Sequence, residues 1–230
     1  MFKSNYDFPD VTTASEEGIV CQGADLNPDT LLHAYSLGMF PWFDEKEDPI
    51  LWWCPDPRCI IFPSKIKISK SMRSVLRNKG FEVRYNTCFA DLIEACKSAP
   101  RIGQGGSWLS KEMKSAYIAI HELGYANSVE VFLNNELVGG LYGISIGKCF
   151  FGESMFSKVA NASKVALVHL SHTLAKEGFN FVDCQMYTDH LQRMGAEMIT
   201  RNKFLSLLKD GINFDKNYNL QQTLKNHETI

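Results

Sequence analysis

The pentapeptide FVDCQ, residues 181–185, places a carboxylate and an amide close together in an apolar stretch. It follows a strongly apolar helical pattern and is predicted to form a short strand. Because side chains alternate along a strand, Phe181, Asp183 and Gln185 would share one face, and Cys184 would point to the other. A buried carboxylate without partners is costly. This face should therefore meet a polar reaction centre, unless the strand end reaches solvent or caps the helix that follows it.

Other chemical motifs give weaker signals. His169 and His172 form an HxxH pair on an apolar helix, but no further ligand stands at a spacing that would complete a zinc site. The sequence contains no P-loop and no GxGxxG motif, so it gives no indication of nucleotide hydrolysis or a dinucleotide cofactor. The seven cysteines are scattered and never form CxxC, which favours reduced thiols over a disulfide framework.

The composition is that of a soluble globular protein. The 230 residues are 45% hydrophobic and 22% charged, and no apolar run approaches the length of a membrane span. The first ten residues, MFKSNYDFPD, lack the basic, apolar and small-residue zones of a signal peptide. We therefore expect a cytoplasmic protein with no membrane partner.

Positive charge is concentrated in one segment, residues 64–84, which holds seven basic residues and a single acidic one. A helix predicted over residues 69–79 would place Lys70, Arg73 and Arg77 on one side. Such a face can bind phosphate. On charge alone, a solvated lysine-rich surface is the more common explanation.

The order of predicted elements indicates the fold class. A helix should begin at Pro28 and end at Gly38, and a segment rich in proline and aromatic residues, 41–63, should form turns and short strands. Helices are predicted over 111–123 and 161–176, with three meandering strands between them and an Asn134–Asn135 turn. The strand 181–185, a short helix over 188–194 and a strand at 196–199 follow. The tail after Phe214 is expected to fray.

These elements predict an α+β protein in two parts. A small N-terminal α/β domain, residues 1–63, would precede an acyl-CoA N-acyltransferase-like (GNAT-like) domain, residues 64–230, with a mixed sheet flanked by helices. An acetyl-CoA enzyme of that fold would hold the pyrophosphate on a glycine-rich loop before the long helix. The corresponding stretch, FFGESMFSKVANASK, lacks that loop and carries Glu153 there. We therefore expect acyl transfer from a different donor, and no cofactor.

Several stretches resemble the bacterial leucyl/phenylalanyl-tRNA–protein transferase family. They are LLHAYSLGMFPWF, ILWWCPDPR, GSWL, HELGYANSVEVF, ELVGGLYG, FFGESMFS, NASK and DCQMYTDHLQRMGA. They occur in order from about Leu31 to Ala196, and FPWF, WWCPDPR, GESMFS and DCQ together are highly specific. The resemblance implies transfer of leucine or phenylalanine, with methionine as a further donor, from aminoacyl-tRNA to proteins that begin with arginine or lysine, as in the N-end rule degradation pathway.

The resemblance also implies catalytic roles. Aminoacyl-tRNA is an activated ester, so no ATP site is required. The attacking α-amine is largely protonated near neutrality, since its pKa is about 7.7–8.0 in model compounds. Asp183 and Gln185 would lie beside the ester, with Gln185 positioning the amine and Asp183 orienting Gln185. An amide is too weak a base to act alone, so the proton acceptor stays open.

Binding roles follow from the same resemblance. Glu153 and Thr188 would bind the cationic acceptor, although Glu153 alone could equally be a surface carboxylate paired with Lys158 or Lys164. Trp42 and Trp108 would flank the terminal adenosine of tRNA, and Trp52 and Trp53 are predicted to pack. Lys70, Arg73 and Arg77 would contact the tRNA backbone. The apolar aminoacyl pocket would be formed by Leu141, Met155, Leu167, Leu170 and Val182.

Other functions predict other behaviour. An acetyl-CoA-dependent N-acetyltransferase would be retained on coenzyme A, and a non-catalytic tRNA-binding protein would bind charged and uncharged tRNA equally. A peptide-branching enzyme of cell-wall synthesis would need a longer chain with duplicated acyltransferase domains. We expect a monomer.

Overall fold

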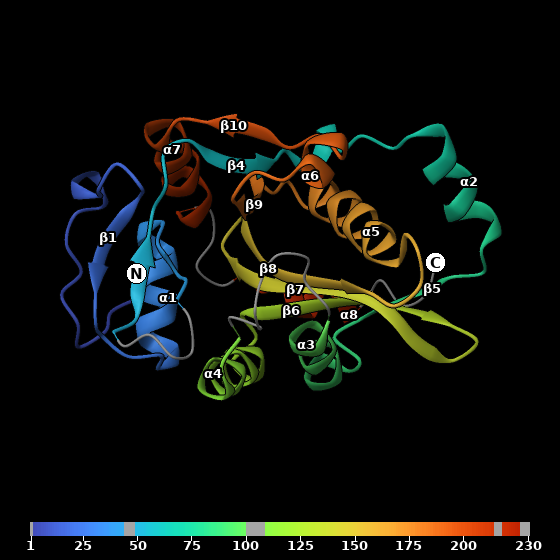
Figure 1. Cartoon of the computed structure of the whole chain (residues 1–230), viewed down its shortest axis with the longest axis horizontal. Coiled ribbons are helices and arrows are strands. Elements are labelled where there is room, and N and C mark those ends of the chain that lie inside the picture. Colours follow the sequence, from blue (N-terminus) through green and yellow to red (C-terminus); the bar gives the residue numbers. More distant parts are fainter. Residues whose placement is uncertain (1, 44–48, 100–108, 214–217, 226–230) are drawn as a thin grey trace.

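The computed structural model describes residues 2–43, 49–99, 109–213 and 218–225. A small N-terminal sheet with one long helix lies beside a larger mixed sheet that is covered by helices (Figure 1). The fold is therefore α+β, with a mixed sheet flanked by helices. Within these ranges, no helix combines the length and the apolar character that crossing a bilayer requires.

The N-terminal part is built from a three-stranded sheet and one helix. A short 3-10 helix at Val11–Thr13 precedes the sheet, whose strand order is β1-β3-β2. Its elements are β1 (Ile19–Gln22), α1 (Pro28–Leu37), β2 (Phe40–Pro41) and β3 (Leu51–Trp53). As predicted, α1 begins at Pro28 and ends at Gly38, whose φ of 93° a side chain would disfavour. Trp52 is fully buried, as expected for a packing residue.

The large sheet has seven strands in the order β10-β4-β9-β8-β7-β6-β5. Every neighbouring pair is antiparallel except β8 and β9, which run parallel. The strands are β4 (Arg58–Ile61), β5 (Glu82–Tyr85), β6 (Ala126–Leu133), β7 (Glu136–Ile146), β8 (Cys149–Ser157), β9 (Phe181–Gln185) and β10 (Glu197–Ile199). Because β4 pairs with β9 and β10, the chain enters the large sheet at Arg58, before the predicted domain boundary. The division at residue 63 stays a prediction.

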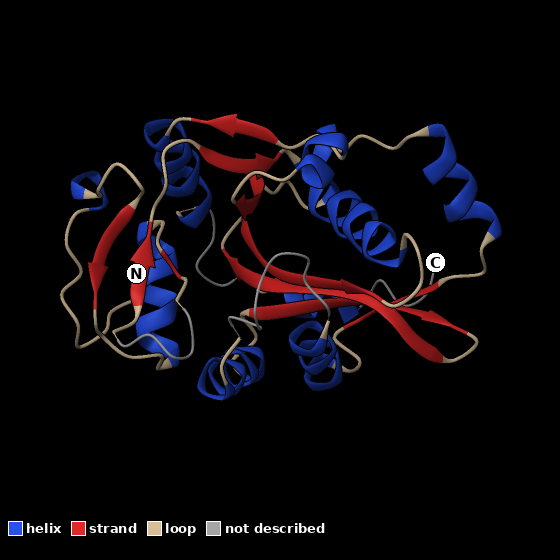
Figure 2. Cartoon of the chain, in the orientation of Figure 1, coloured by secondary structure: helices blue, strands red, loops and turns tan. Residues whose placement is uncertain are grey.

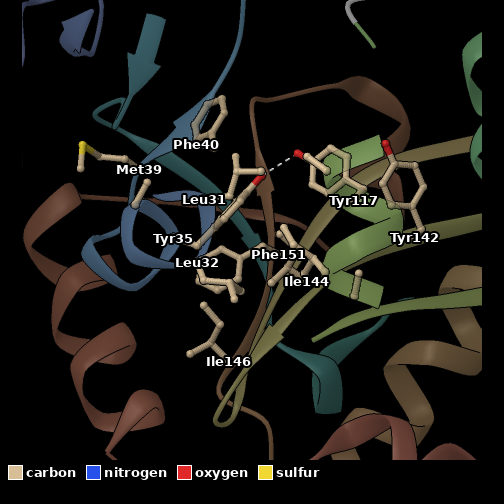
Figure 3. Packing of buried hydrophobic residues seen from close by; sticks show 14 of the residues in the cluster. Leu31, Leu32, Tyr35, Met39, Phe40, Tyr117, Tyr142, Ile144, Ile146 and Phe151 are labelled. Atoms are coloured by element: carbon tan, nitrogen blue, oxygen red, sulfur yellow. Dashed lines mark hydrogen bonds between the residues drawn. The ribbon is translucent and has the colours of Figure 1, made fainter. Parts of the chain in front are cut away.

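Helices cover both faces of the large sheet, as Figures 1 and 2 show. The longest, α5 (Ala162–Lys176), packs on β6, β7 and β8 from one side, whereas α3 (Phe89–Ser98) and α4 (Lys111–Glu122) lie on the other. The remaining helices are η2 (Pro63–Lys65), α2 (Lys70–Asn78), α6 (Asp189–Arg193), α7 (Arg201–Ile212) and α8 (Leu220–Lys225). Apolar side chains form two clusters, one under α5 and the other where α1, α4 and α7 meet the sheet (Figure 3).

Local sequence signals predicted most of these elements. Asn134 and Asn135 adopt φ values of 53° and 64°, which a tight hairpin turn requires, and join β6 to β7. A bulge occurs beside Gly139, where the β6–β7 register shifts. The strands β1 and β5 and the helices α3 and α7 were not predicted. The expectation of a frayed tail was wrong for residues 220–225, because α8 buries Leu220 and Leu224 against the larger fold.

A buried ion pair joins β4 to β9. The Arg58 Nε and Nη2 atoms donate to the two carboxylate oxygens of Asp183 at 2.8 and 2.7 Å, and both side chains are 0% exposed. The guanidinium lies between the rings of Phe40 in β2 and Phe204 in α7, at 4.7 and 4.4 Å from their centroids. Four elements therefore meet at this pair, and each fixes the position of the others.

Replacement of Arg58 by methionine should strongly destabilise the fold. It leaves the Asp183 carboxylate buried without its cation, and breaking such a pair typically costs about 3–5 kcal/mol. The matched control is Lys65→Met, because Lys65 forms an exposed pair with Glu197, with side chains 62% and 47% exposed. That change should cost less than about 1 kcal/mol. Urea unfolding at neutral pH measures both values, and equal losses would contradict the assignment.

Candidate active site

A cavity of about 390 Å³ opens where β8 and β9 stop pairing. The two strands match over three residue pairs, ending at Phe151 opposite Asp183. Beyond this point they separate, and their next residues, 152–155 of β8 and 184–185 of β9, line the space between them. Parallel strands need a crossover, which α5 supplies, and α5 covers the cavity from one side. The cavity is therefore a consequence of the sheet topology.

One wall of the cavity is apolar. It collects side chains from β7, β8, β9, α5 and α6. All five residues predicted for the aminoacyl pocket line it, namely Leu141, Met155, Leu167, Leu170 and Val182. The sequence did not identify Phe150 and Leu191, which also line it. Such a wall can bind an uncharged aliphatic or aromatic side chain.

Asp183 is among the residues that line the cavity, but its carboxylate is buried and is held by protein partners. Besides the ion pair with Arg58, its Oδ1 atom accepts a hydrogen bond of 3.0 Å from the backbone N–H of Gln185. Gln185 adopts a φ of 56°, which is uncommon for a residue other than glycine. Asp183 thus holds the backbone of Gln185 in a turned conformation that ends β9 at the cavity.

Neither alternative for FVDCQ applies to Asp183, although the end of the strand, Cys184 and Gln185, is only partly buried. Asp183 is 0% exposed, and α6 is capped by Thr188, whose Oγ1 atom accepts from the Leu191 N–H at 3.2 Å. Alternation does turn Cys184 away from Asp183, as predicted: Val182 and Cys184 pack with the apolar cluster under α5, and Phe181 packs in the other cluster. Cys184 nevertheless lines the cavity, which the prediction had not included.

Glu153 lies in β8 and faces the same cavity. Its Oε1 and Oε2 atoms accept hydrogen bonds from the hydroxyls of Tyr35 and Tyr117, at 2.7 and 2.6 Å. The two hydroxyls are themselves 2.8 Å apart (Figure 3). Burial raises the pKa of the Glu153 carboxyl to about 7, although the tyrosine hydrogen bonds act in the opposite direction. The carboxyl can therefore exist in either protonation state near neutrality.

The alternative of a surface carboxylate was wrong for Glu153. Lys158 pairs instead with Glu136 at 3.5 Å, and Lys164 donates to the side-chain oxygen of Asn161 at 3.1 Å. With only hydroxyl partners in these contacts, the Glu153 carboxylate retains capacity to bind a cation that enters the cavity.

The other described residues that were predicted to bind the acceptor or the tRNA lie at the edge of the cavity or outside it. Thr188 lines the cavity at the start of α6. Trp42 is 37% exposed and packs on Trp53 at 5.4 Å between ring centroids, but it is not among the residues that line the described cavity. Trp108 lies outside the described residues. Lys70, Arg73 and Arg77 are exposed along α2, as their spacing predicted.

Sequence reasoning also missed the three residues that hold the two carboxylates of the site. Arg58 is one of few basic residues before residue 63 and stands in the apolar stretch RCIIF, a signal for a buried cation that Asp183 would need. Tyr35 and Tyr117 occupy core-facing positions of two helices, and nothing local distinguishes them from packing residues. Among the described residues, no cluster of three or more histidine, cysteine or acidic side chains could hold a metal ion.

Comparisons with known proteins identify the family of this chain. The model of the leucyl/phenylalanyl-tRNA protein transferase family matches residues 60–209, and the model of its N-terminal domain matches residues 24–56. The leucyl/phenylalanyl-tRNA–protein transferase of Aromatoleum aromaticum is 51% identical over 90% of this chain and 87% of its own length. That of Flavobacterium johnsoniae is 50% identical over 91% of this chain and 98% of its own.

A solved structure of a functionally unknown conserved protein from Staphylococcus epidermidis also aligns, with a TM-score of 0.43, 11% identity, and coverage of 79% of this chain and 68% of that chain. A likeness this low adds nothing about function. The family model spans most of the chain, and relatives are about half identical over nearly all of it. The chain therefore belongs to the leucyl/phenylalanyl-tRNA protein transferase family of enzymes.

Proposed function

We propose that this protein transfers leucine or phenylalanine, and also methionine, from aminoacyl-tRNA to the α-amino group of proteins that begin with arginine or lysine. The observation that carries the proposal is a single cavity with an apolar wall for the donor side chain and a carboxyl, Glu153, for the cationic acceptor. We place this reaction in the N-end rule degradation pathway, in the cytoplasm, with the protein acting as a monomer.

The reaction needs positioning rather than activation. The acceptor nitrogen attacks the ester carbonyl, a C–N bond forms, and the bond from the carbonyl carbon to the ribose oxygen breaks. The ribose oxygen leaves with one proton of the neutral amine, and an acceptor that arrives as an ammonium first releases one further proton to solvent. The Gln185 side chain positions the amine, and Asp183 holds Gln185 through its backbone N–H. Holding reactants in line in this way can supply much of the rate enhancement.

Both substrates bind in the same cavity. We place the donor side chain against the apolar residues Met155 and Leu170, and the acceptor beside Thr188 and Glu153, all of which line the cavity. The terminal adenosine stacks on Trp42 and Trp108, and the exposed cations of α2 contact the tRNA backbone. Flexible Met155 helps one pocket to accept two shapes.

We further propose that the C-terminal part is a GNAT-like domain. The β8–α5–β9 crossover and the single parallel pair, at which the sheet opens, support this assignment. In this arrangement the opening between the strands takes the aminoacyl ester of tRNA in place of an acyl-CoA.

The Gln185→Ala variant tests the reaction. Purified protein mixed with leucyl-tRNA and a peptide beginning with arginine should add one leucine residue, detected by mass spectrometry, and an N-acetylated peptide should gain nothing. Loss of a positioning hydrogen bond should reduce kcat/KM by about 10- to 100-fold. The matched control is Gln222→Ala, an exposed glutamine on α8. The absence of transfer by the folded wild type with any of the three aminoacyl-tRNAs would refute the proposal.

A second variant, Glu153→Gln, tests acceptor recognition. Removal of the negative charge should lower kcat/KM for an arginine-initiated peptide by about 10- to 100-fold, the loss expected for a charge-assisted contact. A peptide that begins with alanine should be affected much less, so discrimination between the two acceptors should shrink. Equal losses for both peptides would argue against an acceptor role.

The same variant should alter the pH dependence of stability. The pKa of Glu153 is raised from 4.5 to about 7 in the folded state. Stability from this group is therefore fully present below about pH 4.5 and is lost as pH rises through about 7. The stability of Glu153→Gln relative to wild type should thus increase by on the order of 2 kcal/mol between about pH 4.5 and 8. Parallel denaturation profiles would contradict this expectation.

Donor selection should respond to Leu170, which is 1% exposed and lines the cavity. Leu170→Phe reduces the space in the cavity beside the apolar wall. It should therefore shift the ratio of kcat/KM values by about tenfold towards leucyl-tRNA over phenylalanyl-tRNA. Leu123→Phe, at an exposed leucine beyond α4, is the control and should leave the ratio unchanged. Competition between the two aminoacyl-tRNAs gives the ratio directly, and an unchanged ratio would place the donor elsewhere.

A further inference from the structure

A second, larger cavity of about 670 Å³ lies next to the candidate active site. It lies between the segment that leads into α2, the start of α5, and α6. His190 lines both cavities, so the two adjoin at this residue. We call the second cavity the basic groove, because Lys67, Lys164 and Arg193 line it.

The basic groove carries a positive charge that the protein does not neutralise. Asp189 is its single acidic residue, and it already accepts a hydrogen bond of 2.8 Å from the Tyr187 hydroxyl. In the described part of the chain, none of the three cations has a carboxylate within ion-pair distance. Such a site attracts an anion.

Two further features point to an anion at this place. Burial, and after it the charges of Lys164 and Arg193, lower the pKa of His190, so both cations act on the junction between the cavities. The groove is also lined by Ser69, Ser71 and Met72, which form the cap and first turn of α2. The N-terminus of a helix carries partial positive charge and hydrogen-bond donors, which favour phosphate.

We propose that the basic groove binds the phosphates of the single-stranded 3′ end of aminoacyl-tRNA, an inference that rests on the proposed function. When the aminoacyl ester occupies the active site, the nucleotides that precede the terminal adenosine must extend out of the active-site cavity. The basic groove adjoins that cavity at His190. A cationic acceptor would be repelled there by three positive charges. The exposed cations of α2 lie beyond the groove and are left to contact the tRNA stem.

Three leucyl donors of increasing length distinguish the contacts made by the basic groove from those made by α2. Leucyl-adenosine contains no phosphate, leucyl-CCA contains the phosphodiesters of the 3′ end, and leucyl-tRNA adds the stem. For the Lys164→Gln/Arg193→Gln double variant, kcat/KM should fall about tenfold or more with leucyl-CCA and leucyl-tRNA. With leucyl-adenosine it should stay within about twofold of the wild type. An Arg73→Gln/Arg77→Gln variant should lose activity only with leucyl-tRNA.

Salt dependence supplies a readout that a structural defect would not change. The slope of log KM for leucyl-CCA against log salt should flatten by about 0.7 for each phosphate that the variant no longer neutralises. The control is Lys176→Gln, at the opposite, exposed end of α5.

Three outcomes would overturn the phosphate assignment: equal losses with leucyl-adenosine, no loss with leucyl-CCA, or a raised KM for the acceptor peptide alone. Failure of wild-type protein with all three donors would instead reject the proposed transferase reaction.

Discussion

The Arg58–Asp183 ion pair is the constraint on which the rest of the site depends. Two charges that are both 0% exposed stabilise the fold only as a hydrogen-bonded pair, because each alone would carry a large desolvation cost. Phe40 and Phe204 enclose the guanidinium, so the pair also excludes water and joins the N-terminal sheet to α7. With its carboxylate fixed in this way, Asp183 can hold the turned backbone of Gln185 at the edge of the cavity.

The position of the cavity follows from the one parallel pair in the sheet. If β8 and β9 continued side by side beyond Phe151 and Asp183, backbone hydrogen bonds would fill the space that the cavity occupies. Their separation leaves polar groups of both strands facing the opening, while α5 and β7 supply apolar side chains. The same divergence therefore creates an apolar wall and a polar rim only a few residues apart. A reaction between the ester of an apolar amino acid and the amine of a cationic residue needs both the apolar wall and the polar rim.

Local patterns predicted the elements better than the contacts between them. FVDCQ, the Asn134–Asn135 turn and the ends of α1 and α5 depend on neighbouring residues and could be inferred from the sequence. The partners of the two carboxylates could not, because Arg58 is 125 residues from Asp183 and Tyr35 is 118 residues from Glu153. Tyr35 also has the spacing of a core residue. Family resemblance gathered the residues of the apolar wall, which spacing alone would have assigned to the core.

Charge separates the two substrates that such a transferase must bring together. On the active-site side, Glu153 provides negative charge with a raised pKa, which attracts a cationic amine most strongly once the carboxyl has ionised. On the other side of His190, the basic groove repels that amine and attracts phosphate. The donor phosphates are thus disfavoured beside Glu153, and the cationic acceptor is disfavoured in the basic groove, whereas the reacting groups meet in the active-site cavity. Because His190 is itself kept neutral by burial and by Lys164 and Arg193, it separates the two regions without adding charge to either.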